Sequence, residues 1–78
     1  MIRREEVVGK LVVDAEAKVI GKVVDIVIGQ DGTAQLLAEA EVRRGSKTKR
    51  LEFLIPHYYV SKIGDVVLLS AEAEVRKR

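Results

Sequence analysis

The side chains that most often perform catalysis or bind metals are scarce in this chain of 78 residues. It has one histidine, His57, and no cysteine, which excludes a thiolate nucleophile, a thiolate metal site and a disulfide scaffold. None of the serines Ser46, Ser61 and Ser70 lies in the sequence context of a nucleophile elbow. No glycine-rich phosphate loop or calcium-binding loop is present. We therefore predict that the chain is not an enzyme and carries no metal or cofactor.

A basic segment, residues 43–50, is the strongest candidate for binding. It holds five basic residues and no acidic one, although the net charge of the whole chain is only +2. One interpretation is a solvated hairpin loop whose charges protect a sheet edge against aggregation. The other is a site for an anionic partner, such as an acidic protein tail, RNA or a lipid surface. No aromatic residue that could stack on a base is interleaved with the segment, which disfavours RNA. The candidate residues are Arg43, Arg44, Lys47, Lys49 and Arg50.

Two adjacent tyrosines, Tyr58 and Tyr59, follow His57 and form the second candidate site. Tyrosine is enriched among the residues that dominate binding energy at protein interfaces, so an exposed tyrosine here would anchor a partner. The simpler interpretation is that the turn packs one tyrosine on the domain and exposes the other groups.

The elements that would position these residues are predicted to be short strands. Six glycines and one proline divide the chain at regular intervals, which is typical of an all-β domain. We predict strands at 7–13, Val19–Ile28 and 34–42, with a tight Asp31-Gly32 hairpin turn between the last two. A longer hairpin loop, 43–49, leads into a strand containing Leu51, Phe53 and Ile55.

Near the C-terminus, one helical turn is expected after Pro56, because proline cannot donate a ladder hydrogen bond. A buried strand follows at 66–69. The tail, residues 71–78, alternates Ala and Val with Glu, which suits a further strand or a helix. Its Ala-Glu-Ala-Glu-Val-Arg sequence, 71–76, is identical to residues 38–43.

The strand Val19–Ile28 is apolar on both faces, with Val19, Val23 and Val27 opposite Ile20, Val24, Ile26 and Ile28. A chain of this length buries only roughly 60–65% of its unfolded surface, so additional burial would add stability. An apolar strand of this kind suggests a second buried surface, and we predict a homodimer. The alternative is a bulge near Asp25, which would change the face that points inward.

Three segments in this order resemble the PRC-barrel family, named after the cytoplasmic domain of the photosynthetic reaction centre H subunit. They are Gly9-Lys10-Leu11-Val12-Val13-Asp14, the strand Val19–Ile28, and Ile55-Pro56 followed by residues 60–69. The resemblance implies a single domain, 1–78, with its core at about 6–70. It implies an all-β barrel of five to six mostly antiparallel strands. The positions that match the family pattern are taken as structural: Gly9, Gly21, Val23, Asp25, Pro56, Gly64 and Asp65.

The resemblance also carries functional expectations. The chain is similar to stand-alone archaeal barrels that act as adaptors between proteins, some of them linked to the tubulin-like cell-division ring. The alternative is an RNA- or ribosome-associated barrel, like the C-terminal domain of a ribosome-maturation factor. No apolar run approaches the roughly 20 residues that span a bilayer, and the absence of cysteine suits a reducing compartment. We therefore expect a cytoplasmic protein whose partner is another protein; its high Glu, Lys and Arg content is thermophile-like.

Overall fold

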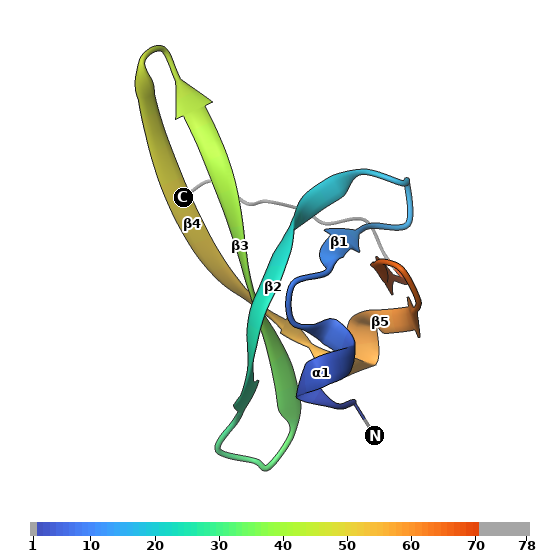
Figure 1. Cartoon of the computed structure of the whole chain (residues 1–78). Coiled ribbons are helices and arrows are strands. Elements are labelled where there is room, and N and C mark those ends of the chain that lie inside the picture. The colour runs from blue at the N-terminus through green and yellow to red at the C-terminus, as the bar shows by residue number, and fades with distance from the viewer. Residues whose placement is uncertain (1, 71–78) are drawn as a thin grey trace.

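Six strands form one mixed sheet in the order β4-β3-β2-β1-β6-β5 (Figure 1). The computed structural model describes residues 2–70. All neighbouring strands are antiparallel except β1 and β6, which are parallel. Within residues 2–70, β4 and β5 are the two edges, so the sheet curls without closing. The strands are β1 (Leu11–Val13), β2 (Val19–Ile28), β3 (Ala34–Arg44), β4 (Lys47–Pro56), β5 (Val60–Ile63) and β6 (Val67–Leu69). The predicted all-β fold of mostly antiparallel strands is confirmed.

The two long hairpins close through turns that glycine makes possible. Between β2 and β3, the Gly29 N–H donates to the Thr33 carbonyl at 2.8 Å, and Gly32 has φ +85°. This is the predicted Asp-Gly turn. Between β3 and β4, Arg44 pairs with Lys47 across only Gly45 and Ser46, and Gly45 has φ +60°. Glycine at the first position of a two-residue loop suits a type II′ turn. The predicted loop at 43–49 is therefore wrong, because most of those residues belong to the strands.

The first segment also differs from the prediction of a strand at 7–13. Residues Arg4–Val7 form one helical turn, α1, and the chain becomes extended only at Leu11. Gly9 separates the two with φ +90°, a conformation that ends any strand there. The turn delivers Val7, which is fully buried, to the core. At the other end of the chain, the predicted turn after Pro56 is confirmed as the 3₁₀ helix η1 (His57–Tyr59), whereas β5 was not predicted as a strand.

Bulges in strand β2 change which of its residues point toward the core. Its register with β3 shifts between Val23 and Asp25, and its register with β1 shifts near Ile20. Val23 is consequently buried, and Ile26, three residues later, packs against the same core. The bulge near Asp25 thus brings apolar residues from both predicted faces of this strand to the core, while Val19, Val27 and Ile28 remain exposed. The pattern in β2 by itself no longer indicates a dimer interface.

The core is small and lies where β1, β2, β3 and β6 meet. It consists of eight buried apolar residues: Val7, Val12, Val23, Leu36, Ala38, Ile55, Val67 and Leu69. One buried carboxylate, Asp14, adjoins it, with a relative exposure of 3%. Its Oδ1 accepts the backbone N–H groups of Glu16 and Lys18, both at 2.9 Å, and so closes the turn between β1 and β2.

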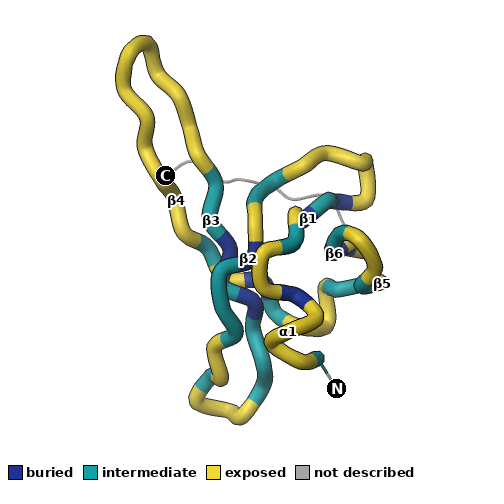
Figure 2. Tube along the Cα trace, in the orientation of Figure 1, coloured by how far each residue is buried: buried dark blue, intermediate teal, exposed yellow. Residues whose placement is uncertain are grey.

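The hairpin of β3 and β4 extends well beyond this core (Figures 1 and 2). We call residues 41–52 the arm, because every one of them is exposed. The ten residue pairs of the hairpin run without a bulge from Gln35 and Pro56 to Arg44 and Lys47. The ladder is therefore continuous, although only its base is packed against other elements.

A close approach at Gly21 gives the first testable prediction. A Cβ there would lie 2.7 Å from the Glu39 carbonyl oxygen and 3.0 Å from Cζ of Phe53. Gly21→Ala should therefore lower the free energy of unfolding by about 1–3 kcal/mol, the usual effect of overpacking. Urea denaturation measures it. Gly64→Ala is the matched control, since a Cβ at Gly64 meets no atom within 4 Å. Equal midpoints for the two variants would contradict the packing described.

A second prediction concerns Asp25, whose carboxylate joins α1 to the β2 bulge. It accepts from Arg4 Nε at 2.9 Å and from the Ile26 N–H at 2.8 Å. The Arg4 hydrogen bond, followed by the Ile26 N–H, lowers the pKa of Asp25. A carboxyl whose folded pKa is below its unfolded value of about 3.9 stabilises the fold above that pH. This stabilisation is lost as the pH falls through the folded pKa.

Asp25→Asn should therefore flatten the decline of stability below about pH 4, and Arg4→Gln should do so in part. Both groups are exposed, so the effect should be small and should shrink at high salt. Denaturant midpoints at pH 7 and at steps from pH 5 to pH 2 measure it. An acid profile for Asp25→Asn that matches the wild type would refute this role.

Candidate interaction surface

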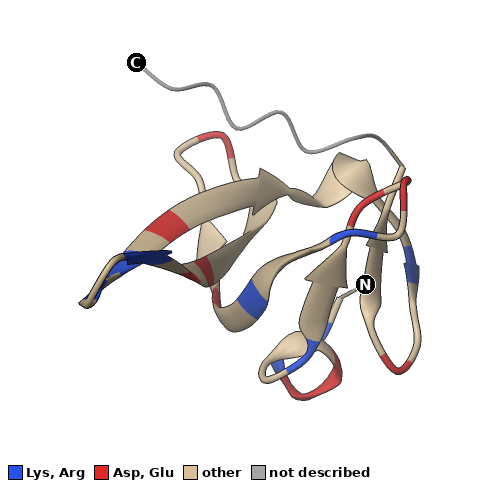
Figure 3. Cartoon of the chain, turned by 90° about the horizontal axis from the view of Figure 1, so that it is seen from above, with Lys and Arg blue, Asp and Glu red and all other residues tan. Residues whose placement is uncertain are grey.

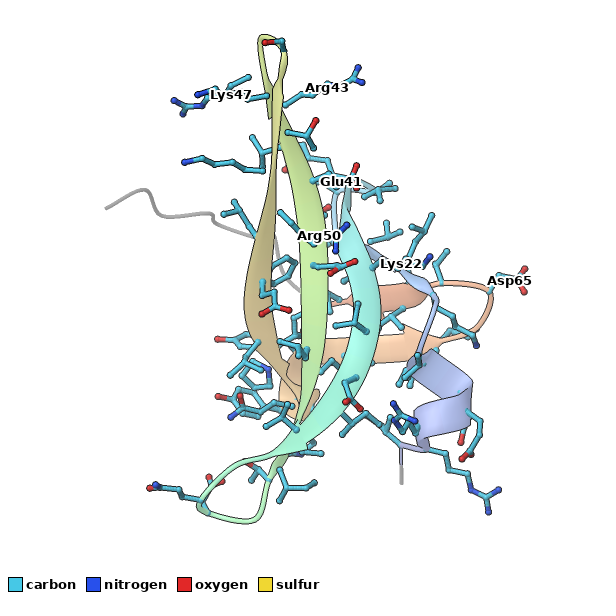
Figure 4. All side chains as sticks on the ribbon, turned by 60° about the vertical axis from the view of Figure 1, so that its left-hand side comes forward. Lys22, Glu41, Arg43, Lys47, Arg50 and Asp65 are labelled. Atoms are coloured by element: carbon cyan, nitrogen blue, oxygen red, sulfur yellow. The ribbon has the colours of Figure 1, made fainter. Side chains whose placement is uncertain are left out.

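The basic residues gather at the end of the arm but on both of its faces. Arg44, Lys47 and Lys49 share the face of the buried Ala38, because residue pairs in a ladder alternate sides. Arg43 and Arg50 lie on the opposite face. Figure 4 shows Arg43 and Lys47 projecting to opposite sides, and Figure 3 shows the cations at the tip. The predicted basic segment is thus a positive tip surrounding a turn, with no single charged face.

Four of these cations are not neutralised by neighbours. Arg50 lies 3.9 Å from Glu39 and directly across from Glu41. Within residues 2–70, no carboxylate forms an ion pair with Arg43, Arg44, Lys47 or Lys49. We call these four residues the basic tip. Their charges are free to attract an anionic group, which salt would weaken because they are exposed.

An apolar stripe connects the basic tip to the core. Val42 and Leu51 lie on the core-facing side of the arm, with relative exposures of 37% and 48%. They continue the row formed by Ala38, Ala40 and the half-buried Phe53. No other element of the described chain covers Val42 and Leu51, so the arm presents apolar surface beside its charges.

The tyrosines lie at the other end of β4. Tyr58 and Tyr59 belong to η1, directly after Pro56, and their ring centroids are 5.0 Å apart. His57 meets Tyr58 edge-on at 5.7 Å. Both tyrosines are exposed, Tyr58 at 68%, so the turn does not pack one of them on the core as the simpler interpretation expected. The ten residues of β4 separate them from the basic tip by roughly 30 Å. One chain therefore does not bring the two candidate sites together.

The family-motif residues serve the fold, although not all in the expected way. Gly9, Gly21, Val23 and Asp25 fix the start of β1 and the path of β2, as described above. Pro56 ends β4 opposite Gln35. The Gly64 carbonyl accepts a hydrogen bond from Lys10 Nζ. The Asp25 carboxylate accepts a hydrogen bond from a backbone N–H at the bulge, whereas no described backbone group bonds to the Asp65 carboxylate.

Asp14 is the residue that sequence reasoning missed. The sequence places it only at the end of the first segment that resembles the family, and nothing there predicts its burial. The available signal was Asp at the first position of a polar five-residue segment between two strands, since Asp side chains bond to N–H groups two residues on.

The described residues present charge and apolar surface that a partner can contact. Across the described residues, no three His, Cys, Asp or Glu side chains gather to hold a metal ion. The hollow lined by Leu11, Val19, Lys22 and Glu39 is open to solvent. In residues 2–70, no helix has the length and apolar content needed to cross a bilayer. Charge at the basic tip and apolar contact along the arm are the features available to a partner.

Comparison with known proteins agrees with the topology. No curated protein sequence matches this chain. A family model for the PRC-barrel domain matches residues 1–76, almost the entire length. The match includes Gly9, Gly21 and the bulged strand β2, which shape this sheet. The chain therefore belongs to the PRC-barrel family.

Proposed function

We propose that this chain is a non-catalytic cytoplasmic adaptor that uses its basic tip to bind an acidic segment of another protein. The observation that carries the proposal is the arm itself. A two-stranded ribbon is marginally stable alone in water, yet here one extends beyond the core with every residue of 41–52 exposed. Its end holds four cations without an ion-pair partner in the described structure.

The distribution of the cations favours an extended acidic protein segment. Charges on both faces of a narrow turn can be met by carboxylates that wrap around it, and Arg offers bidentate bonds to carboxylate. Sequence-tolerant RNA binding uses aromatic side chains as stacking platforms beside the cations. The only described tyrosines lie at the far end of β4. Assembly with the archaeal division ring, which the family resemblance suggests, is one form that this adaptor role would take.

A matched pair of variants tests the proposal. The tip variant carries Arg43→Gln, Arg44→Gln, Lys47→Gln and Lys49→Gln. The control carries Arg3→Gln, Lys18→Gln, Lys22→Gln and Lys62→Gln, four exposed cations outside residues 41–52, so the net charge changes equally. Each protein, and the wild type, is used for affinity capture from native lysate with and without nuclease, followed by mass spectrometry.

We expect the wild type and the control to retain the same acidic protein after nuclease treatment. Recovery by the tip variant should fall at least about tenfold, the ratio that corresponds to 1.4 kcal/mol. Capture that nuclease abolishes would favour the RNA-binding alternative. Capture that the tip variant retains in full would place the binding surface elsewhere.

A further inference from the structure

The outer edge of β4 is a regular strand with an unused row of backbone groups. Its ten residues pair with β3 without a bulge, and β4 has no second neighbour within residues 2–70. Proteins usually shorten, bulge or cover such an edge, because it is a template for pairing with another strand. This edge is long and has no bulge, so it is able to pair with a further strand.

The tight turn of the arm determines which residues face outward. Arg44 and Lys47 close a two-residue turn, and such a closing pair exchanges backbone hydrogen bonds. Bonded and non-bonded pairs then alternate down an antiparallel ladder. By this alternation, Leu51 directs its N–H and C=O toward Ala40. Arg50 and Glu52 direct theirs away from β3, toward solvent.

The side chains at this position are self-complementary. Arg50 and Glu52 flank Leu51 and share the outer face, while Leu51 lies on the core-facing side. We propose that a second copy of this chain pairs with this edge, β4 antiparallel to β4, with a two-fold axis at Leu51. Arg50 then lies opposite the partner's Glu52, and Glu52 lies opposite the partner's Arg50. Each of these pairs also exchanges the two outward-facing backbone hydrogen bonds.

Neighbouring registers lack this match. A two-fold axis perpendicular to the sheet keeps each side chain on its own face, so the axis must pass beside a single residue of β4. The neighbouring choices are therefore Arg50 and Glu52. An axis at Arg50 would place Arg50 opposite the partner's Arg50, and an axis at Glu52 would place two carboxylates together. Like charges directly opposite each other destabilise a strand pair, whereas opposite charges stabilise it by roughly 0.2–1 kcal/mol. Charges that only prevented strand pairing could have any order. In this edge, one basic and one acidic residue flank the apolar Leu51, which is the order that a two-fold axis at Leu51 makes complementary.

The same register brings the β4 side of the apolar stripe to the contact between the two copies. Leu51 meets the partner's Leu51 on the core-facing side, and Lys49 lies opposite the partner's Phe53. Burying apolar surface contributes roughly 25 cal/mol per Å², and Leu51 is half exposed in the single chain. The dimer thus removes part of the Leu51 side chain from water, while Val42 lies on β3, one strand away from the partner.

This pairing also unites the two candidate sites that one chain separates. Lys47 lies opposite the partner's Ile55, so the turn of each arm reaches the partner's Pro56 and the tyrosines that follow it. Each end of the dimer then combines a basic tip with a pair of exposed tyrosines from the other copy. This composite surface, which rests on the proposed function, would bind a protein segment that carries acidic side chains for the basic tip and apolar or aromatic side chains for the tyrosines.

Cysteine cross-linking tests the register directly, because the chain contains no cysteine. In the proposed ladder, Leu51 and the partner's Leu51 form a non-hydrogen-bonded pair with Cα atoms about 4.5 Å apart, within the range of a disulfide. Leu51→Cys should form a covalent dimer under mild oxidation. Leu54→Cys is the matched control, since its exposure is 51% against 48% for Leu51. Leu54 lies opposite the partner's Thr48, so the two Leu54 positions are six residues, or about 20 Å, apart.

We expect light scattering of the full wild-type chain to give a dimer mass at high micromolar concentration, and Leu51→Cys alone to cross-link. Equal cross-linking of both variants would overturn the register. A monomeric wild type would overturn the proposal. None of these measurements depends on the acidic partner, so failure here is distinct from failure of the proposed function.

A charge exchange provides a second test that does not depend on oxidation. Arg50→Glu and Glu52→Arg should each weaken the homodimer, because each places like charges opposite one another. Mixed together, the two variants should form a heterodimer, which native mass spectrometry resolves. If the mixture contains no more heterodimer than each variant alone contains homodimer, the Arg50–Glu52 pairing is contradicted.

Discussion

The β3–β4 ladder continues past the point at which the core ends, and most other features of the surface follow from this. At its base, Leu36, Ala38 and Ile55 are buried against β1, β2 and β6. A few residues further along, the same face presents Val42 and Leu51 to solvent. The sheet is hydrogen-bonded along the whole length, so the arm keeps its strand pairing without hydrophobic cover. Charge, apolar surface and free backbone groups are thereby combined on one narrow element.

The small core explains why none of the other elements within residues 2–70 covers this arm. Eight buried apolar residues occupy the space under β1, β2, β3 and β6. Two further devices bring residues to that space: the α1 turn supplies Val7, and the β2 bulge turns both Val23 and Ile26 inward. With those positions used at the base, the described chain has no remaining element for the core-facing side of the arm. A second copy paired with the β4 edge would shield Leu51 at the border of that side and would leave Val42 on β3 exposed.

Much of the framework followed from local sequence signals. Strand β2 and the Asp31-Gly32 turn were predicted with their observed positions, because β-branched runs and Asp-Gly turns are governed by local backbone preferences. The segment containing Arg43 and Lys49 was not, since its charges resemble a loop while its Gly45-Ser46 turn is short enough to leave them in strands. Val7 and Asp14 were missed because their burial depends on the three-dimensional path set by Gly9 and by the turn before Lys18.

The candidate site was predictable in its residue types but not in its arrangement. The basic residues and the tyrosines were named from sequence, yet their separation by the length of β4 depends on strand lengths that the short turn determines. Strand or helix in the tail could not be decided from its alternation, and residues 71–78 lie outside the described structure. The β4 edge itself has no sequence signature, because an edge is defined by the absence of a neighbouring strand.

Amide hydrogen exchange, followed by NMR over a dilution series, tests the central claim that a second copy occupies this edge. By the alternation of the ladder, the N–H groups of Leu51 and Phe53 point toward β3, while those of Arg50 and Glu52 point away from it, toward an edge that no strand within residues 2–70 occupies. The account predicts that the Arg50 and Glu52 amides are protected at high protein concentration and exchange faster on dilution, while Leu51 and Phe53 remain protected. Rapid exchange of Arg50 and Glu52 at every concentration would contradict it.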